Sequence, residues 1–410
     1  MINAPCPRLT SSYLAQMRAL LILLASSAGL CAAKRTELGF PQLKERIQVA
    51  FPENYDSAKK WPAVFYYHGT GGKPTTELMQ GHTGNKDWFV VGMTYLQGGN
   101  IPATAEYIEK EFQIFKSARK YLAGKWNLDP RRTYVAGFSK GGWMSGFLLQ
   151  RDPTIAGAII LGAGHNYLIR KPYKFRTKKP IFLGIGRKDP IYPFALRALV
   201  HYRPLGAQTT IETWHELGHR FPSDGSQPLR QWLTLQAHPG TNHQAATKWI
   251  EERLDEIKGK PNLVDQWVAL RDLEETPYLR LLGEKWKEKI QNQIVDLEKG
   301  GRVSAETTAL KEHRLLLRKE LKGHSLPLCQ QLAGNYLELS EKHTGTRQAE
   351  IALLDHERIK QLAKHFKEQV KIAKDKKDNT FPPATGEEED HPFPKLPTRL
   401  PVIPRNPLIR

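Results

Sequence analysis

Between residues 46 and 236, short apolar runs rich in β-branched residues alternate with amphipathic stretches of helical period. Such runs are typical of strands covered on both faces, and the stretches between them are typical of the covering helices. The alternation predicts an α/β fold with a doubly wound, mainly parallel sheet. The expected strands are 46–51, 63–67, 88–94, 133–138, 155–161, 181–185 and 209–214. The expected helices are 104–122, 141–150, 194–201 and 228–236, and a proline indicates a turn over 127–132.

The pattern changes beyond about residue 245 to long helical periods rich in Lys, Glu and Leu. In the segment 245–378, two sets of residues each fall on a single helical face. They are Tyr278, Leu282, Trp286, Ile290, Ile294 and Leu297, and Ile351, Leu354, Arg358, Leu362, Phe366 and Val370. Because the periods restart at glycine-containing breaks, we expect an all-α region of helical hairpins or a bundle rather than one continuous coiled coil. Residues 379–410 contain eight prolines and an acidic run, which predicts an extended or disordered tail.

Residues 1–33 have the pattern of an export signal, with an arginine, an apolar run of roughly ten residues and then small residues. A polar leader precedes Met17, which is an alternative initiator. Cys31 suggests a lipoprotein anchor, but Leu30 stands where a lipobox has a small residue. After cleavage only Cys329 remains, so no intramolecular disulfide is expected. We therefore expect a secreted or periplasmic protein, with membrane tethering as the weaker alternative.

The formal net charge of +19 is unevenly distributed along the chain. Residues 1–247 contain 31 Lys and Arg against 15 Asp and Glu, whereas residues 248–378 contain 26 against 23. A strongly basic surface attracts anionic partners. The basic first part therefore fits either an anionic substrate or association with an anionic cell envelope.

Gly137 to Gly141 spell G-x-S-x-G around Ser139, directly after an expected strand and before an expected helix. A nucleophile elbow requires this context, because its sharp turn lifts the serine hydroxyl above the sheet. The turn leaves no room for a β-carbon at either flank, which accounts for the two glycines. The pentapeptide alone is a weak signal, since serine also occurs in glycine-rich turns that have no catalytic role.

A second segment, "VFYYHGTGG" over residues 64–72, runs from an expected strand into a small, glycine-rich loop. Backbone N–H groups of such a loop can stabilise the charge that develops on a carbonyl oxygen during acyl transfer. We expect the N–H of Thr70, or alternatively that of Gly71, to form an oxyanion hole with the N–H of Lys140. An ordinary loop is the alternative interpretation, and His68 is expected to be structural.

Two further residues follow expected strands, Asp189 in "GRKDP" and His219 in "ELGHRFP". Functional groups of doubly wound sheets gather at the carboxyl ends of the strands. Ser139, Asp189 and His219 also follow the chain order of a known Ser-His-Asp arrangement, so we expect them to form a catalytic triad. His215 is a competing base, but it lies at or inside the strand, whereas His219 lies in a glycine-flanked loop.

With the motifs HGTGG, GFSKGG, GRKD and LGH, residues 46–236 resemble the α/β-hydrolase superfamily. The likeness is greatest to its secreted esterase branch, with dienelactone-hydrolase-like, feruloyl- or acetylxylan-esterase-like and polyhydroxybutyrate-depolymerase-like members. The resemblance implies a catalytic domain over 34–240 that works through an acyl-enzyme and needs no metal or organic cofactor. Thr70 departs from the pattern where depolymerase-like members often have cysteine, and Lys140 is unusual after the nucleophile.

Candidate substrate contacts lie around the expected catalytic face. The loop 162–180 carries six Lys or Arg residues interleaved with aromatic residues such as Tyr167. It is either a lip for an anionic or carbohydrate substrate or a solvated loop, and it is too short for a large cap. Trp143 and Trp214 are either core residues or part of an acyl pocket. Basic and aromatic residues also alternate in nucleic-acid binders, but the export signal and the triad argue against a nucleic-acid partner.

These features together favour a serine-dependent hydrolase of carboxylic esters, such as acyl or feruloyl esters of polysaccharide. A serine peptidase of the same superfamily is one alternative, although such peptidases usually carry a cap or propeller. A non-catalytic envelope or binding protein is another, with the hydrolase domain as a scaffold and the helical region binding a protein partner. An intact triad weighs against that second alternative.

Overall fold

A computed structural model describes residues 34–96, 105–165, 175, 178–238, 242–274, 276–301 and 303–378. In these ranges, eight strands form one sheet in the order β1-β2-β4-β3-β5-β6-β7-β8. β2 pairs antiparallel with β1 and β4, and every other neighbouring pair is parallel. The strands are β1 (Arg35–Leu38), β2 (Ile47–Ala50), β3 (Trp61–Tyr67), β4 (Phe89–Met93), β5 (Leu128–Phe138), β6 (Gly157–Leu161), β7 (Pro180–Gly186) and β8 (Gln208–Trp214).

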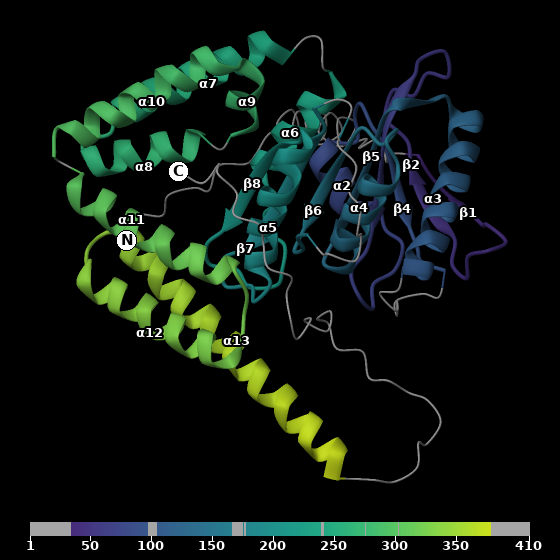
Figure 1. Cartoon of the computed structure of the whole chain (residues 1–410). Coiled ribbons are helices and arrows are strands. Elements are labelled where there is room, and N and C mark those ends of the chain that lie inside the picture. Colours follow the sequence, from purple (N-terminus) through teal and green to yellow (C-terminus); the bar gives the residue numbers. More distant parts are fainter. Residues whose placement is uncertain are drawn as a thin grey trace, which may run out of the picture.

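Helices cover both faces of this sheet (Figure 1). They are α2 (Glu77–Thr83), α3 (Ala105–Trp126), α4 (Lys140–Arg151), α5 (Tyr192–Tyr202) and α6 (Gln227–Ala237). Successive residues of a strand point to opposite faces, and in β3 Phe65 packs with α3, α4 and α5 while Val64 packs with α2 and α6. The predicted doubly wound, mainly parallel sheet is therefore confirmed.

Three local features differ from expectation. β1 is a short, half-exposed strand at the sheet edge, and α2 has only seven residues, so neither has enough periodicity to be predicted. The turn expected over 127–132 is instead the start of β5. The pairing of β3 with β5 shifts its register there, and Pro130, which lacks an N–H donor, is accommodated at this irregularity.

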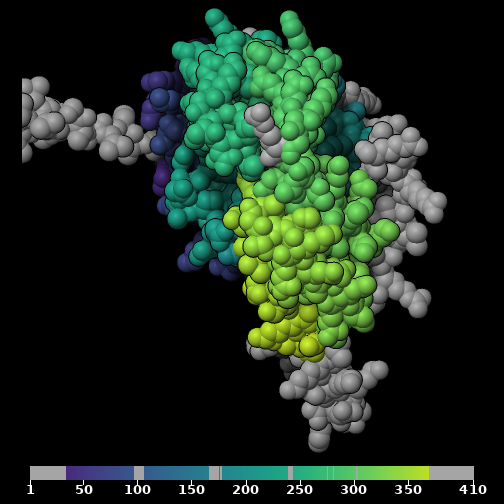
Figure 2. Space-filling model, turned by 90° about the vertical axis from the view of Figure 1, so that its left-hand side faces the viewer, coloured from purple at the N-terminus to yellow at the C-terminus, as the bar shows by residue number. Residues whose placement is uncertain are grey.

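The remaining chain forms the expected all-α region. Its helices are α7 (Asn242–Lys258), α8 (Leu263–Glu274), α9 (Pro277–Leu282), α10 (Glu284–Lys299), α11 (Ser304–Leu321), α12 (Leu326–Lys342) and α13 (Arg347–Asp378). They lie beside the β7–β8 side of the sheet, opposite β1 (Figure 1). Seen from that side, the teal and green surface of the upper helices lies above the green and yellow surface of the later helices that end in α13 (Figure 2).

The first apolar face expected in this region is divided between two helices. Gly283, in a conformation with φ of 83° and ψ of −169°, separates α9 from α10. Leu282, Ile290 and Ile294 still reach a common core with α7 and α8. The periodicity over 278–297 still indicated which residues are buried, because the chain after the break at Gly283 continues with the same side facing the core.

The helical region packs directly against the sheet domain. Leu317 of α11 joins an apolar cluster with Ile185 of β7 and with Tyr192 and Phe194 of α5. Arg197 of α5 donates a hydrogen bond to the carbonyl of Leu321 at the end of α11 (3.3 Å). A cation at this position also interacts favourably with the helix dipole. Charged and apolar contacts therefore both join the two regions.

No helix in the described ranges has the length and apolar composition that crossing a membrane requires. The expected signal region 1–33 and tail 379–410 lie outside the described residues, as does most of the loop 162–180.

Candidate active site

Ser139 occupies a sharp turn between β5, which ends at Phe138, and α4, which begins at Lys140. Its backbone has φ of 54° and ψ of −118°, a conformation that residues with a β-carbon rarely adopt. The Ser139 N–H donates to the carbonyl of Leu161 (2.8 Å), and its carbonyl accepts the N–H of Trp143 (3.1 Å). The turn is thus fixed by β6 on one side and by the first turn of α4 on the other.

The two flanking glycines are needed for the steric reason inferred from the sequence. A β-carbon on Gly137 would lie 2.2 Å from the backbone carbon of Gly141. A β-carbon on Gly141 would lie 1.9 Å from the carbonyl oxygen of Tyr67 in β3. Both contacts are with backbone, so neither can be relieved by rotating a side chain.

The structure brings Ser139, His219 and Asp189 together at the carboxyl ends of β5, β7 and β8. His219 Nε2 lies 2.8 Å from Ser139 Oγ, and its Nδ1 lies 2.7 Å from Asp189 Oδ2. A carboxylate only accepts hydrogen bonds, which assigns the imidazole proton to Nδ1 and leaves Nε2 to accept the serine hydroxyl. Asp189 is fully buried, whereas the His219 side chain is 30% exposed.

The loops that carry Asp189 and His219 hold each other in place. Lys188 donates its backbone N–H to Leu217 O (2.9 Å), and the Leu217 carbonyl oxygen lies 2.4 Å from the site of a β-carbon on Gly186. The second oxygen of Asp189, Oδ1, accepts the N–H of Ile191 (3.0 Å) at the start of α5. Both carboxylate oxygens therefore have partners, which restricts rotation of the side chain.

The His-Gly loop lies against the serine turn. A β-carbon on Gly69 would be 3.5 Å from Ser139 Cβ, and Gly71 has φ of 70°. His68 is buried beside this loop, with Nδ1 2.7 Å from the Gly69 carbonyl and its own carbonyl accepting the Tyr95 hydroxyl (2.7 Å). Burial lowers the pKa of His68, so the ring is neutral and supports the loop.

The Lys140 side chain extends toward this same loop. Its ammonium lies 5.5 Å from the centre of the Tyr95 ring, a cation–π distance. Glu111 nearby accepts the Leu96 N–H (2.8 Å) and the Tyr107 hydroxyl, and burial raises the pKa of its carboxyl. Lys140, the unusual residue after Ser139, therefore has Tyr95 as an aromatic neighbour, and the Tyr95 hydroxyl bonds the His68 carbonyl at the start of the His-Gly loop.

The other candidate residues have different positions. Trp143 is half-buried on α4 and packs edge-on against Phe194, with ring centres 5.6 Å apart. Trp214 is buried at the end of β8 in the core beneath α6. There it packs edge-on against Phe221, with ring centres 5.1 Å apart. Tyr167 lies outside the described residues.

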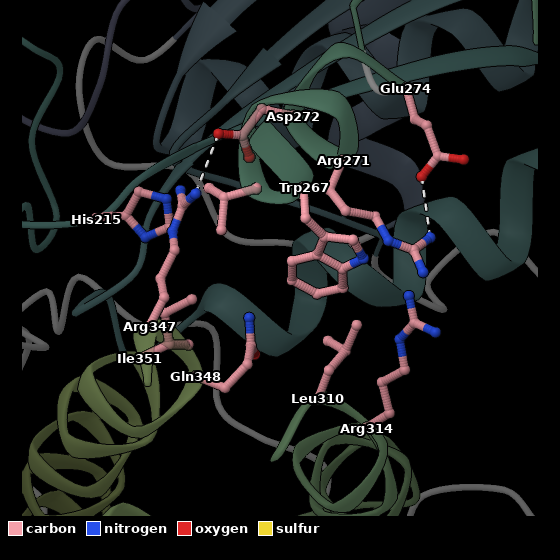
Figure 3. Close-up of a pocket in the computed structure, with 11 residues that line it drawn as sticks. His215, Trp267, Arg271, Asp272, Glu274, Leu310, Arg314, Arg347, Gln348 and Ile351 are labelled. Carbon is pink, nitrogen blue, oxygen red and sulfur yellow. Dashed lines mark hydrogen bonds and ion pairs between the residues drawn. The ribbon is translucent and has the colours of Figure 1, made fainter. Parts of the chain in front are cut away.

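His215, the competing base, faces a hollow between the sheet domain and the helical region. The hollow has a volume of about 210 Å³ and is lined by apolar, acidic and arginine side chains (Figure 3). Arg347 lies between His215 and Asp272 and pairs with the latter at 3.2 Å. None of Ser139, Asp189 or His219 lines this hollow, so His215 and His219 belong to different surroundings. Within the described ranges, no group of three or more His, Cys, Asp or Glu residues could hold a metal ion.

Comparison with known proteins identifies similar folds only. No family model matches the chain, and no curated protein matches it. A Mesorhizobium loti carboxylesterase structure is 17% identical and covers 48% of this chain and 98% of its own, with a TM-score of 0.39. A feruloyl esterase module from Clostridium thermocellum is 16% identical and covers 46% and 82%, with a TM-score of 0.35. An acylaminoacyl peptidase from Pyrococcus horikoshii is 15% identical and covers 53% and 42%, with a TM-score of 0.40.

Similarity at this level says nothing about activity. The chain's own sheet order is more informative, because it combines an antiparallel β2 with parallel strands from β4 to β8. A serine on the strained turn after β5 and polar groups after β7 and β8 complete the arrangement. This chain therefore has the α/β-hydrolase fold.

Proposed function

We propose that the protein is a serine-dependent hydrolase of carboxylic esters that works through an acyl-enzyme. The observation that carries the proposal is the position of His219, within hydrogen-bond distance of both Ser139 Oγ and Asp189 Oδ2. This geometry is what a nucleophile, its general base and the group that orients the base require. The strained elbow adds support, because strain is retained mainly where the surrounding structure enforces it.

In the proposed reaction, Ser139 Oγ attacks the ester carbonyl carbon while its proton passes to His219 Nε2. The tetrahedral intermediate then collapses, the bond to the alcohol oxygen breaks, and Nε2 returns the proton to the departing alcohol. Water next gives a proton to Nε2 and attacks the acyl carbon. The carboxylic acid leaves as Ser139 recovers its hydroxyl proton. Asp189 remains ionised and stabilises the imidazolium formed in each half.

The intermediate oxygen needs fixed donors, and we assign this role to the N–H groups of Thr70 and Lys140, with Gly71 as the alternative to Thr70. The N–H of Lys140 follows the nucleophile at the start of α4, where the helix dipole favours negative charge. Gly69, immediately before Thr70, packs against Ser139, which supports the proximity of that loop. Such donors typically contribute about 3–4 kcal/mol each.

For the substrate, we propose an acyl or feruloyl ester linked to polysaccharide or to a similar bulky, anionic alcohol, encountered after export to the periplasm or outside the cell. The surplus of positive charge in residues 1–247 supports an anionic partner. Only 18 residues separate β6 from β7, and the His219 side chain is partly exposed, which supports an open site.

Matched serine variants test the nucleophile. Ser139→Ala should lower turnover of p-nitrophenyl acetate and butyrate by about 10⁴-fold or more, because the attacking atom is removed. Ser145→Ala is the control, since this buried serine of α4 donates its hydroxyl to the Gly141 carbonyl of the same helix (2.8 Å). A fluorophosphonate probe should label the wild type and Ser145→Ala, but not Ser139→Ala. Equal turnover by Ser139→Ala would contradict the assignment, and an unlabelled, folded wild type would favour a scaffold role.

Matched histidine variants test the base. His219→Asn should lower kcat strongly. His215→Asn should leave kcat within about twofold of the wild type, because His215 faces a hollow that Ser139 does not line. The reverse result would make His215 the base. A panel of acyl-ester, feruloyl-ester and peptide substrates, with Ser139→Ala as background, then separates an esterase from a peptidase.

A further inference from the structure

Arg187, two residues before Asp189, has a buried partner in the helical region. The guanidinium follows β7, yet it is bound by Asp355 of α13, which is 168 positions away in the sequence. Arg187 Nε donates to Asp355 Oδ1 (2.8 Å), and Nη2 donates to Asp355 Oδ2. This two-point arrangement fixes the orientation of both groups, which a single contact would not do.

Arg187 also holds the other end of the loop that contains Asp189. Its Nη1 donates to the Tyr192 hydroxyl (2.6 Å) on the first turn of α5, and its guanidinium lies 4.5 Å from the Tyr192 ring centre. The Tyr192 N–H in turn donates to the carbonyl of Asp189 (2.9 Å). One side chain therefore connects the residues before and after Asp189 and ties them to α13.

Asp355 is itself held by a buried network of charges. Arg358, one turn further along α13, donates to Asp355 Oδ1 (3.1 Å) and to both oxygens of Glu320 on α11. Tyr336 of α12 donates its hydroxyl to Glu320 (2.9 Å). His313 of α11 lies 2.7 Å from Asp355, and burial lowers the pKa of His313, so it is neutral. Among these residues, the cations Arg187 and Arg358 balance the anions Asp355 and Glu320, and His324 also lies 3.4 Å from Glu320.

Stability alone does not account for such a network. Burying an ion pair costs about as much desolvation energy as the pair recovers, and apolar replacements are often neutral or stabilising. The geometric effect of a buried pair is different, because charged groups with several partners hold their neighbours in one arrangement. Here that arrangement includes the backbone on both sides of Asp189.

We infer that Asp355 and Arg187 are positioning residues, through which helix α13 holds the loop that presents Asp189 to His219. The inference rests on the proposed function, and it gives the helical region a role in catalysis. Neither residue touches the reacting atoms. Their effect is to keep Asp189 where it fixes the orientation and tautomer of the imidazole.

The test compares Asp355→Asn with Glu320→Gln in the full-length protein. Both remove one buried negative charge of the same network, but only Asp355 contacts Arg187. Asp355→Asn should lower kcat roughly 10- to 100-fold with KM for a p-nitrophenyl ester nearly unchanged, because a displaced triad member impairs the chemical step. Glu320→Gln should keep kcat within about twofold of the wild type, even if its melting temperature falls as far as that of Asp355→Asn. Equal losses of kcat in both variants, or a wild-type kcat for folded Asp355→Asn, would overturn the inference.

A milder pair covers the case in which these variants fail to fold. Arg187→Lys keeps the charge but loses the two-point contact with Asp355 and the bond to Tyr192. Tyr336→Phe removes one hydroxyl contact at the far end of the network. Arg187→Lys should show the selective loss of kcat, and Tyr336→Phe should not. The opposite order of effects would be inconsistent with positioning.

Amide hydrogen exchange separates this inference from the proposed function. In Asp355→Asn and Arg187→Lys, the peptide spanning 186–192 should exchange faster than in the wild type, whereas peptides of β3 and β4 should not change. This readout does not depend on any substrate. If the wild type is inactive and unlabelled but the loop exchanges faster in the variants, the proposed hydrolase function is rejected, while the positioning role of Asp355 and Arg187 is kept. If the wild type is active but folded variants show unchanged exchange and unchanged kcat, only the positioning role of Asp355 and Arg187 is rejected.

Discussion

At the scale of single residues, the site depends on where a β-carbon can be placed. Ser139 has a β-carbon in a conformation that costs roughly 1–3 kcal/mol, while its neighbours Gly137 and Gly141 have none. The backbone of β3 passes so close to Gly141 that only hydrogen fits there. The position of the Ser139 hydroxyl therefore depends on the close backbone packing at the two glycines as much as on the hydrogen bonds of the turn.

A pair of glycine substitutions tests this exclusion. Gly141→Ala should destabilise the protein by several kcal/mol and remove ester turnover, because the new methyl group would meet the Tyr67 carbonyl at 1.9 Å. Gly334→Ala in α12 is the control, since its β-carbon would have no neighbour within 4 Å. There the more helical alanine should stabilise by about 0.5–1 kcal/mol. Thermal melts and p-nitrophenyl butyrate turnover measure both effects, and an active, stable Gly141→Ala would show that β3 can move away.

The positions of Ser139, Asp189 and His219 were predictable because each follows a strand that can be read locally. Each lies within a few residues of an apolar run, and the sheet brings the ends of such runs together. The preference for His219 over His215 followed from the glycine-flanked loop of His219, and the structure places His219 beside Ser139 and His215 in a hollow that Ser139 does not line. Arg187 had no comparable signal, because its partner is distant in the sequence.

At the scale of elements, helix α13 shows both what periodicity reveals and what it hides. Arg358 falls on the apolar face of this helix in the sequence, and the structure buries it completely. A cation on such a face requires a buried anion, and Asp355 lies three residues before it. The second anion, Glu320, belongs to α11 and could not be inferred from the period of α13. The local pattern thus placed Arg358 on this face but did not reveal the tertiary contact that balances its charge.

A histidine pair between β6 and α5 predicts a pH effect on stability. His165 and His201 stack with ring centres 3.4 Å apart, and burial lowers their pKa values to about 3 and about 4. In the unfolded chain both titrate near the usual value of about 6.5. The unfolded state therefore binds more protons below that pH, so stability that is complete above pH 6.5 is lost as the pH falls toward 4.

The measurement is the melting temperature between pH 7 and pH 4. His201→Phe keeps a flat ring but removes one titrating group, so its melting temperature should fall less steeply over this range than that of the wild type. His243→Phe, at an exposed position on α7, should retain the wild-type slope. Identical slopes for His201→Phe and the wild type would mean that the pair does not contribute to acid sensitivity.

At the scale of the whole molecule, the sheet domain and the helical region form one packed structure. The pattern of apolar residues changes near residue 245 and so divides the two regions in the sequence, because strand and helix periods are local properties. The contacts that join them are not local, and they include the Arg187–Asp355 pair and the cluster around Leu317. For this reason the sequence indicated two regions but gave no sign that one supports the other.

The final prediction concerns separation of the two regions. A chain ending at residue 240 would leave the buried Arg187 guanidinium without its carboxylate and would uncover apolar residues near Tyr192. Removing one partner of a buried ion pair typically costs about 3–5 kcal/mol, which is a large share of the stability of one domain. The truncated chain should therefore be poorly soluble or melt well below the full-length protein. Co-expression with residues 242–378 as a separate chain should restore solubility, measured by co-purification, and should restore labelling of Ser139 by a fluorophosphonate. A soluble, fully active 34–240 fragment would show instead that α13 is dispensable for the position of Asp189.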